Sequence, residues 1–164
     1  MPALLVIDIQ NGLTHDKKLF NESLFFQTVN NTIKKFRTQG YTIIFFQHNN
    51  KQLVQDSNAW QIDSRIDKDH GDIIIQKFHA DAFEGTALQD VLGRKGIREI
   101  MVCGLVTHGC IRSTCLGGLK NHYRTGLLKG GHTNWHKNAE FKIEETEKEL
   151  AGKGVHIGGD IPEK

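Results

Sequence analysis

Short apolar runs recur along the chain, separated by stretches with helical periodicity. The runs are rich in β-branched and aromatic residues, and they are short enough for strands buried on both faces of a parallel sheet. The fifth run is weakened by Gly126, and the sixth is short. Candidate strands therefore fall at 3–7, 41–46, 72–76, 97–103, 123–129 and 155–157.

Helices are expected between these runs, where apolar side chains return every three or four residues. The first lies between residues 24 and 36 and ends at Gly40, and the second begins at Thr86 and ends at a following glycine. The third follows the fourth strand and is weakened by Gly117 and Gly118. A charged helix is expected at 139–151.

This alternation of strands and helices indicates βα units and an α/β fold with three layers, α/β/α. The sheet is expected to be mainly parallel and Rossmann-like, with about five to six strands in the common order 3-2-1-4-5-6. No linker or internal repeat divides the chain, so one domain over 1–164 is expected, with a loose glycine-rich tail at 158–164.

Chemically useful side chains stand at the carboxyl ends of three predicted strands. Asp8 follows the first strand, Lys77 follows the third, and Cys110 lies in the turn after the fourth. Ligands of open α/β sheets bind outside these strand ends, where the strand order reverses. Because the first and fourth strands are neighbours in this order, Asp8 and Cys110 should face each other, as a base and a nucleophile must.

Cys110 opens a helix in the segment VCGLVTHGCIRSTC, residues 102–115. The amides and partial positive charge of a helix N-terminus favour a thiolate, so they should lower the pKa of this thiol. The competing interpretation is a small buried hydrophobe, which most free cysteines are. Cys103 is expected in the core, Cys115 is assigned no role, and no disulfide is expected.

Composition and charge exclude several classes of function. The 21 basic and 19 acidic residues are scattered in both signs, so a nucleic-acid partner is not expected. No apolar run approaches the ~20 residues that cross a membrane, so no membrane partner is expected. Residues 1–9 lack the features of a signal peptide, and a cytoplasmic location is expected.

Three segments resemble, in the same order, motifs of the isochorismatase-like cysteine hydrolases, a superfamily that includes nicotinamidases and carbamoylsarcosine amidases. They are ALLVIDIQ at 3–10, IIIQKFHADAFEGTAL at 73–88 and VCGLVTHGCIRSTC at 102–115. Weaker similarity continues through GGHTNW and the last helix. Each motif alone is a weak signal, but three together in this order are a strong one.

The resemblance implies a role for each of the three side chains at the predicted strand ends. Cys110 corresponds to the nucleophile, Asp8 to the proton shuttle and Lys77 to their positive partner. A cis peptide is implied between Val106 and Thr107, beside the nucleophile. The backbone amides of Thr107 and Cys110 are the candidate donors of an oxyanion hole.

The implied activity is hydrolysis of the C–N bond of a small amide through a thioester intermediate. Relatives of this kind are homo-oligomers, so a dimer or tetramer is expected, and no cofactor is predicted. One alternative is vinyl-ether hydrolysis of an isochorismate-like substrate, for which family members need the aspartate but not the thiol. Another is a non-catalytic binding protein that retains the fold, suggested by the glycine-rich segment after Cys115.

The sequence also departs from the family pattern. Metal-dependent nicotinamidases carry Asp-x-His after the second strand, whereas FFQHNN leaves His48 without the aspartate, with His70 as a possible third ligand. His132 and His136 are four residues apart but lack the glutamate of HExxH, so no metal is predicted.

Other departures bear on the substrate and on the fifth strand. Ala82 precedes Phe83 where relatives often have serine, and GGH at 130–132 stands where Asp-Ala-His is common. Aromatic walls with a few polar groups suit small ligands. The pocket candidates are Gln10, His48, Trp60, Phe83 and His108.

Overall fold

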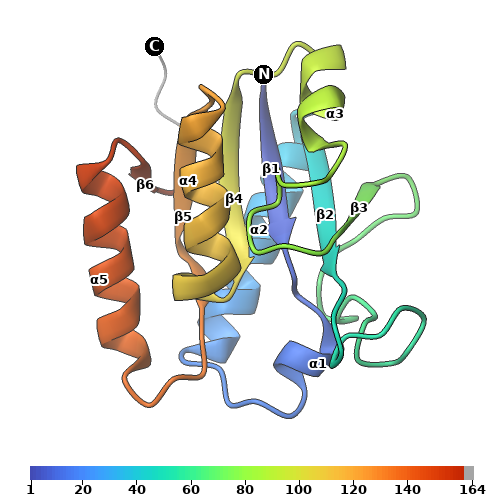
Figure 1. Cartoon of the computed structure of the whole chain (residues 1–164), viewed down its shortest axis with the longest axis vertical. Helices are drawn as coiled ribbons and strands as arrows, with labels where there is room; N and C mark the ends of the chain where they lie inside the picture. Colours follow the sequence, from blue (N-terminus) through green and yellow to red (C-terminus); the bar gives the residue numbers. More distant parts are fainter. Residues whose placement is uncertain (161–164) are drawn as a thin grey trace.

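The computed structural model describes residues 1–160, which form a six-stranded parallel sheet with helices on both faces (Figure 1). The strand order is β3-β2-β1-β4-β5-β6, which confirms the predicted α/β architecture and strand order. The last four residues of the expected tail, 161–164, lie outside the described part. The strands are β1 (Pro2–Ile7), β2 (Thr42–His48), β3 (Ile73–Lys77), β4 (Glu99–Leu105), β5 (Arg124–Thr133) and β6 (His156–Gly158).

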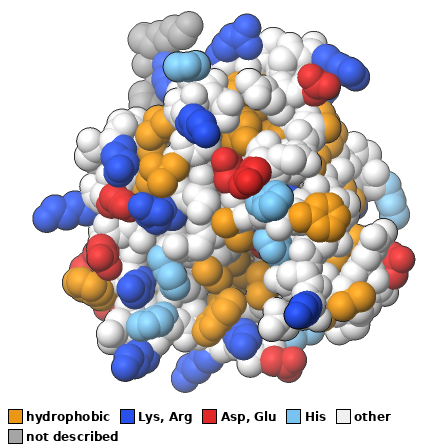
Figure 2. All heavy atoms as spheres, viewed as in Figure 1, with side chains coloured by type: hydrophobic (Ala, Val, Ile, Leu, Met, Phe, Trp, Pro, Cys, Tyr) orange, Lys and Arg blue, Asp and Glu red, His pale blue; other side chains and the backbone are white. Residues whose placement is uncertain are grey.

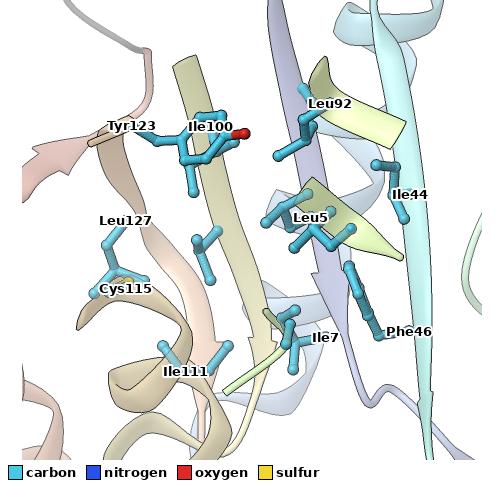
Figure 3. Packing of buried hydrophobic residues seen from close by; sticks show 14 of the residues in the cluster. Leu5, Ile7, Ile44, Phe46, Leu92, Ile100, Ile111, Cys115, Tyr123 and Leu127 are labelled. Carbon is cyan, nitrogen blue, oxygen red and sulfur yellow. The ribbon is translucent and has the colours of Figure 1, made fainter. Parts of the chain in front are cut away.

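Two apolar layers hold the sheet between its helices. On one face, side chains such as Leu5 and Phe46 pack against α3 (Leu88–Arg94), α4 (Arg112–Lys120) and α5 (Ala139–Gly152), as Figure 3 shows in part. On the other face, Leu4 and its neighbours pack against α2 (Glu22–Thr38). Because β1 is buried on both faces, its unbroken apolar run matches the pattern of a central parallel strand.

The two adjacent glycines of α4 are packing positions, contrary to the expectation that they weaken the helix. A Cβ on Gly117 would lie 2.3 Å from Asp81 Oδ1, and a Cβ on Gly118 would lie 2.5 Å from Thr125 Oγ1. Larger residues could not fit there without displacing these neighbours. The helix forms because close packing on Asp81 and β5 offsets the poor helix propensity of glycine.

Several element boundaries differ from the prediction. β2 extends to His48 and β4 to Leu105, and β5 continues to Thr133. The short helix α1 (Asn11–Thr14) was not predicted, because it lies in a polar segment with no apolar periodicity. The expected runs stopped at polar residues or glycines, whereas the backbone pairing continues, for example between His48 and Lys77.

The surface facing the viewer in Figure 2 carries basic and acidic side chains interspersed with one another. This agrees with the scattered charges of the sequence and shows no broad field of one sign on that face. Among the described residues, no helix has the length and apolar character needed to cross a membrane.

Candidate active site

Four adjacent strands bring polar side chains to one edge of the sheet. Asp8 follows β1, His48 ends β2 and Lys77 ends β3, while Cys110 lies in η1 (Thr107–Ile111), a π-helical turn after β4. A carboxylate oxygen of Asp8, a ring nitrogen of His48 and the sulfur of Cys110 all lie within 4.8 Å of one another. The strand order therefore unites residues that are far apart in the sequence.

The ammonium group of Lys77 lies at the centre of this cluster and is fully buried. Its Nζ lies 3.0 Å from Asp8 Oδ2 and 3.3 Å from Cys110 Sγ. It also donates a hydrogen bond to the carbonyl oxygen of His79 at 3.0 Å. A buried charge is tolerated only when it is paired and hydrogen-bonded, and Lys77 meets both conditions.

Asp8 is buried, with backbone in the left-handed region at φ 53°. Burial raises the pKa of its carboxyl group, while the positive charge of Lys77 and the nearby thiol act in the opposite direction. Its Oδ2 pairs with Lys77, but its Oδ1 has no hydrogen-bond partner among the described residues. The carboxylate group thus keeps one oxygen without a hydrogen bond from the described part of the chain, and an oxygen of the group lies within 4.8 Å of the Cys110 sulfur, as a proton acceptor requires.

Cys110 does not have the lowered pKa that its position at a helix start suggested. Burial raises the pKa of its thiol to about 12, and the negative charge of Asp8 adds to this effect while Lys77 opposes it. The lowering expected from the helix start is not found, because the desolvation of a half-buried thiol outweighs the favourable charges. At neutral pH the resting group is a thiol that needs a base.

His48 is neutral in this arrangement, and its tautomer follows from its contact with Lys77. Lys77 Nζ lies 2.8 Å from His48 Nδ1, and because an ammonium group can only donate, Nδ1 accepts and the ring proton lies on Nε2. Burial and the charge of Lys77 both lower the pKa of His48, in agreement with the neutral ring.

The residue types of this cluster could also ligate a metal ion, so the fit of a cation has to be examined. Lys77 Nζ lies between the three candidate ligands, 3.0 Å from Asp8, 2.8 Å from His48 and 3.3 Å from Cys110. The ammonium group therefore takes the place that a cation would need. His70, the possible third ligand, is exposed in the loop before β3 and does not join the cluster.

Gln10 supports His48 and does not offer a free amide to a ligand. Its Nε2 donates to the carbonyl oxygens of His48 at 3.1 Å and Trp60 at 2.9 Å, and its Oε1 accepts the N–H of His48 at 2.9 Å. The side chain is fully buried. The expectation that Gln10 lines the pocket is corrected, because all of its amide contacts are made with the backbone.

The other pocket candidates lie in different surroundings. Trp60 is half-buried and donates its indole N–H to Gln76 at 3.2 Å. The ring of Phe83 packs against Tyr123, beside the apolar core, at a centroid distance of 5.4 Å. His108 is exposed and faces α5, where it lines a cavity of about 500 Å³. Only His48, among the five pocket candidates, contacts Lys77 directly.

The backbone turn beside Cys110 differs from the prediction in one detail. The cis peptide joins Leu105 to Val106, one residue earlier than the expected bond between Val106 and Thr107. The pairing of β4 continues to Leu105, opposite Thr133, so the chain reverses at the last residue of the strand. Among residues 1–160, the N–H of Thr107 has no backbone acceptor.

Two residues near this turn had not been assigned to the site. His132 is buried, with its Nδ1 2.9 Å from Thr107 Oγ1 and its Nε2 3.0 Å from Glu147 Oε1. From the sequence, His132 was weighed with His136 as a zinc ligand and noted in the departure GGH, but it was given no role. The two glycines before it, just after the predicted fifth strand, were the available signal, whereas its glutamate partner on a distant helix could not be identified.

Comparison with known proteins gives consistent matches over most of the chain. The family model described as Isochorismatase domain matches residues 2–146. A Bacillus subtilis protein described as the uncharacterized isochorismatase family protein YddQ is 27% identical, over 74% of this chain and 71% of its own length. The N-carbamoylsarcosine amidase of Arthrobacter is 36% identical over 44% of this chain, but this segment covers only 27% of the amidase.

The solved structures agree with this result. A crystal structure described as an isochorismatase family protein is 28% identical and superposes with a TM-score of 0.88, covering 95% of this chain and 96% of the other. The fold is thus one with experimentally determined examples.

Proposed function

Because the chain belongs to the isochorismatase family of hydrolases, as the match over residues 2–146 shows, we propose that it hydrolyses the C–N bond of a small amide through a thioester on Cys110. The observation that supports this most directly is the buried ammonium of Lys77, which contacts both the carboxylate of Asp8 and the thiol of Cys110. An amidase among the relatives supports the same class of substrate.

The first step is proton transfer from Cys110 to Asp8. The thiol is protonated at rest because its pKa is raised to about 12, so attack requires a base close to the sulfur. Asp8 offers its unpartnered Oδ1, and its raised pKa makes it a better proton acceptor than an exposed aspartate. Lys77 stabilises the negative charge while it moves from the carboxylate to the sulfur.

The sulfur then attacks the carbonyl carbon, and a C–S bond forms as the carbonyl oxygen becomes an oxyanion. The N–H groups of Thr107 and Cys110 are the proposed donors to this oxyanion. Thr107 is suited to the role because its N–H has no backbone acceptor among residues 1–160. Preorganised amides of this kind stabilise a developing charge without reorientation during the reaction.

Collapse of the tetrahedral intermediate breaks the C–N bond, and the protonated Asp8 gives its proton to the departing nitrogen. The products of this half-reaction are ammonia or an amine and a thioester on Cys110. Asp8, again ionised, then removes a proton from water, which attacks the thioester and restores the thiol. The remaining product is a carboxylic acid, and no external oxidant or reductant is consumed.

The test is release of ammonia or amine from a panel of small amides that includes nicotinamide. The wild-type protein should release nitrogen from at least one amide, and Cys110→Ala should not. Hydrolysis of an isochorismate-like vinyl ether that persists in Cys110→Ala but depends on Asp8 would instead identify vinyl-ether chemistry. A protein that hydrolyses no substrate, and whose Cys110 is as inert to dilute iodoacetamide as a buried thiol, would be a binding protein.

Several properties of the whole protein stay predictions. These are a single domain over 1–164, a cytoplasmic location and a homo-oligomer. Light scattering coupled to size-exclusion chromatography measures the oligomeric state directly. A measured mass equal to that of one chain would contradict the homo-oligomer.

A further inference from the structure

A chain of two buried hydrogen bonds connects the turn before Cys110 to helix α5. Thr107 Oγ1 lies 2.9 Å from His132 Nδ1, and His132 Nε2 lies 3.0 Å from Glu147 Oε1. Thr107 and His132 are buried, while Glu147 is only partly exposed and also accepts a hydrogen bond from Lys129 at 3.2 Å. None of these side chains contacts Lys77 or Asp8 in the described structure, so the proposed chemistry leaves them unexplained.

The direction of the hydrogen bond between His132 and Glu147 follows from the groups involved. The hydrogen bond with His132 lowers the pKa of Glu147, so its carboxylate is ionised and can only accept. His132 Nε2 therefore carries a proton that it donates to Glu147. His132 Nδ1 lies 2.9 Å from the Thr107 hydroxyl, which can either donate or accept, so both ring nitrogens and the Thr107 hydroxyl are engaged.

The position of His132 depends on an irregularity in β5. Val102 pairs with Leu127, but Gly104 pairs with His132, although regular pairing would place Lys129 opposite Gly104. The intervening residues form a bulge in which Gly130 adopts φ +76°, a conformation that glycine adopts without strain. The bulge thus places His132, and not Lys129, opposite Gly104 and close to the turn.

We propose that His132 and Glu147 are positioning residues that hold Thr107 so that its backbone N–H faces the reacting carbonyl oxygen. This inference rests on the proposed function, because it assigns Thr107 to the oxyanion hole. Anchoring the Thr107 side chain from β5 and α5 restricts rotation of the peptide that carries the N–H. An oxyanion hole is effective only when its donors are oriented before the charge develops.

The inference can be tested with two reagents that react with the same sulfur. p-Nitrophenyl acetate acylates Cys110, with a new C–S bond, loss of p-nitrophenolate and transfer of the thiol proton to the base, and this reaction passes through an oxyanion. With methyl methanethiosulfonate, the Cys110 sulfur attacks the thiomethyl sulfur, the S–S bond of the reagent breaks and methanesulfinate leaves, with the thiol proton passing to the base; no carbonyl oxyanion forms. Comparison of the two rates separates orientation of the oxyanion hole from activation of the thiol.

The informative variants are Glu147→Ala and Thr107→Val, with Glu147→Gln as the conservative change. In the first two, acylation of Cys110 should slow about tenfold, less than the ~10²-fold loss expected when an oxyanion donor is removed outright. Disulfide formation should change by less than about twofold, because Asp8 and Lys77 are untouched. Glu147→Gln keeps a carbonyl oxygen that accepts from His132, so it should recover most of the acylation rate.

Two control variants lie close to the chain of hydrogen bonds but outside it. Glu144→Gln alters an exposed glutamate on the same helix, and Lys129→Ala removes the exposed partner of Glu147. Both should leave the two rates within about twofold of the wild type, since exposed ion pairs contribute little. Equal slowing of both reactions in Glu147→Ala, or no slowing of acylation in Thr107→Val, would overturn the inference.

Amide hydrogen exchange distinguishes failure of this inference from failure of the proposed function. If wild-type Cys110 is not acylated, the proposed function fails, and exchange at residues 106–111 then decides the positioning role. Faster exchange there in Glu147→Ala than in Glu144→Gln supports positioning. Identical exchange in the two variants contradicts it.

Discussion

Cys110 and Cys115 are five residues apart, yet they lie in two different regions of the molecule. Cys115 packs in the apolar layer near Ile111 and Leu127 (Figure 3), whereas Cys110 lies at the margin of this layer, beside Lys77. Burial raises the pKa of both thiols, to about 12 for Cys110 and higher for Cys115. The two thiols therefore do not differ by a lowered pKa at Cys110. They differ because only Cys110 lies beside a base, Asp8, and a cation, Lys77.

This difference indicates how the site is expected to work. A thiol held in its protonated form is a poor nucleophile until a base accepts its proton. Proton transfer to Asp8 then produces the nucleophile only when an electrophile is in place. The apolar interior offers Cys115 no such acceptor, because its surroundings are hydrocarbon side chains.

The comparison is tested most strongly by removing each thiol in turn. Cys110→Ala should abolish amide hydrolysis, with a loss on the order of 10⁴-fold or more, because the nucleophile is absent. Cys115→Ala should keep the wild-type rate and lower the free energy of unfolding by about 1–2 kcal/mol, through a small cavity. Steady-state ammonia release and urea denaturation measure the two effects. Similar rates of ammonia release in the two variants would show that Cys110 and Cys115 do not differ in their role in hydrolysis.

Asp8→Asn should give the next largest effect. The amide keeps the size of the side chain but cannot accept the thiol proton, so the rate should fall about 10²- to 10⁴-fold. The rate of reaction of Cys110 with methyl methanethiosulfonate at neutral pH should fall with it. If hydrolysis falls while this reaction stays at the wild-type rate, Asp8 does not activate the thiol.

The pH dependence should follow the ionisation of Asp8. The ionised carboxylate is the active form, and burial raises its pKa above the ordinary value of 3.8. Activity should therefore be lost as the pH falls through this raised value, about tenfold per pH unit below it. A profile of kcat/KM at constant ionic strength, with circular dichroism to exclude unfolding, gives the result. An acid limb at or below the ordinary value would contradict the proposed environment of Asp8.

Gln10→Ala should have the smallest effect on catalysis and a measurable effect on stability. It removes three hydrogen bonds to the backbone of His48 and Trp60, so we expect a loss of about 1–3 kcal/mol in the free energy of unfolding. Gln52→Ala is the matched control, because Gln52 is exposed in the following loop. Equal unfolding curves for the two variants would show that Gln10 does not support His48.

The sequence allowed much of this arrangement to be predicted. Unbroken apolar runs indicated central parallel strands, and the residues that follow such runs must meet at one edge of the sheet. That reasoning placed Asp8 opposite Cys110, and the resemblance to the family added Lys77 to the pair. The contact of His48 with Lys77 follows from the pairing of β2 with β3, but the polar end of β2 concealed how far this strand extends.

Other features could not be read from the sequence, for definite physical reasons. The bulge that brings His132 opposite Gly104 changes the register by several residues, and no local pattern encodes that change. The partner Glu147 lies on a helix whose rotation about its axis is set by packing. The pKa of Cys110 was predicted in the wrong direction, because burial and the charge of Asp8 act through three-dimensional contacts.

The most direct test of the central claim is to capture the intermediate on Cys110. Turnover of the best amide from the panel is stopped with acid, and the peptides are analysed by mass spectrometry. We predict that the acyl group of the substrate is found on the peptide that carries Cys110, and that hydroxylamine removes it. Turnover that proceeds without any acyl group on Cys110, and at an undiminished rate in Cys110→Ala, would contradict the account.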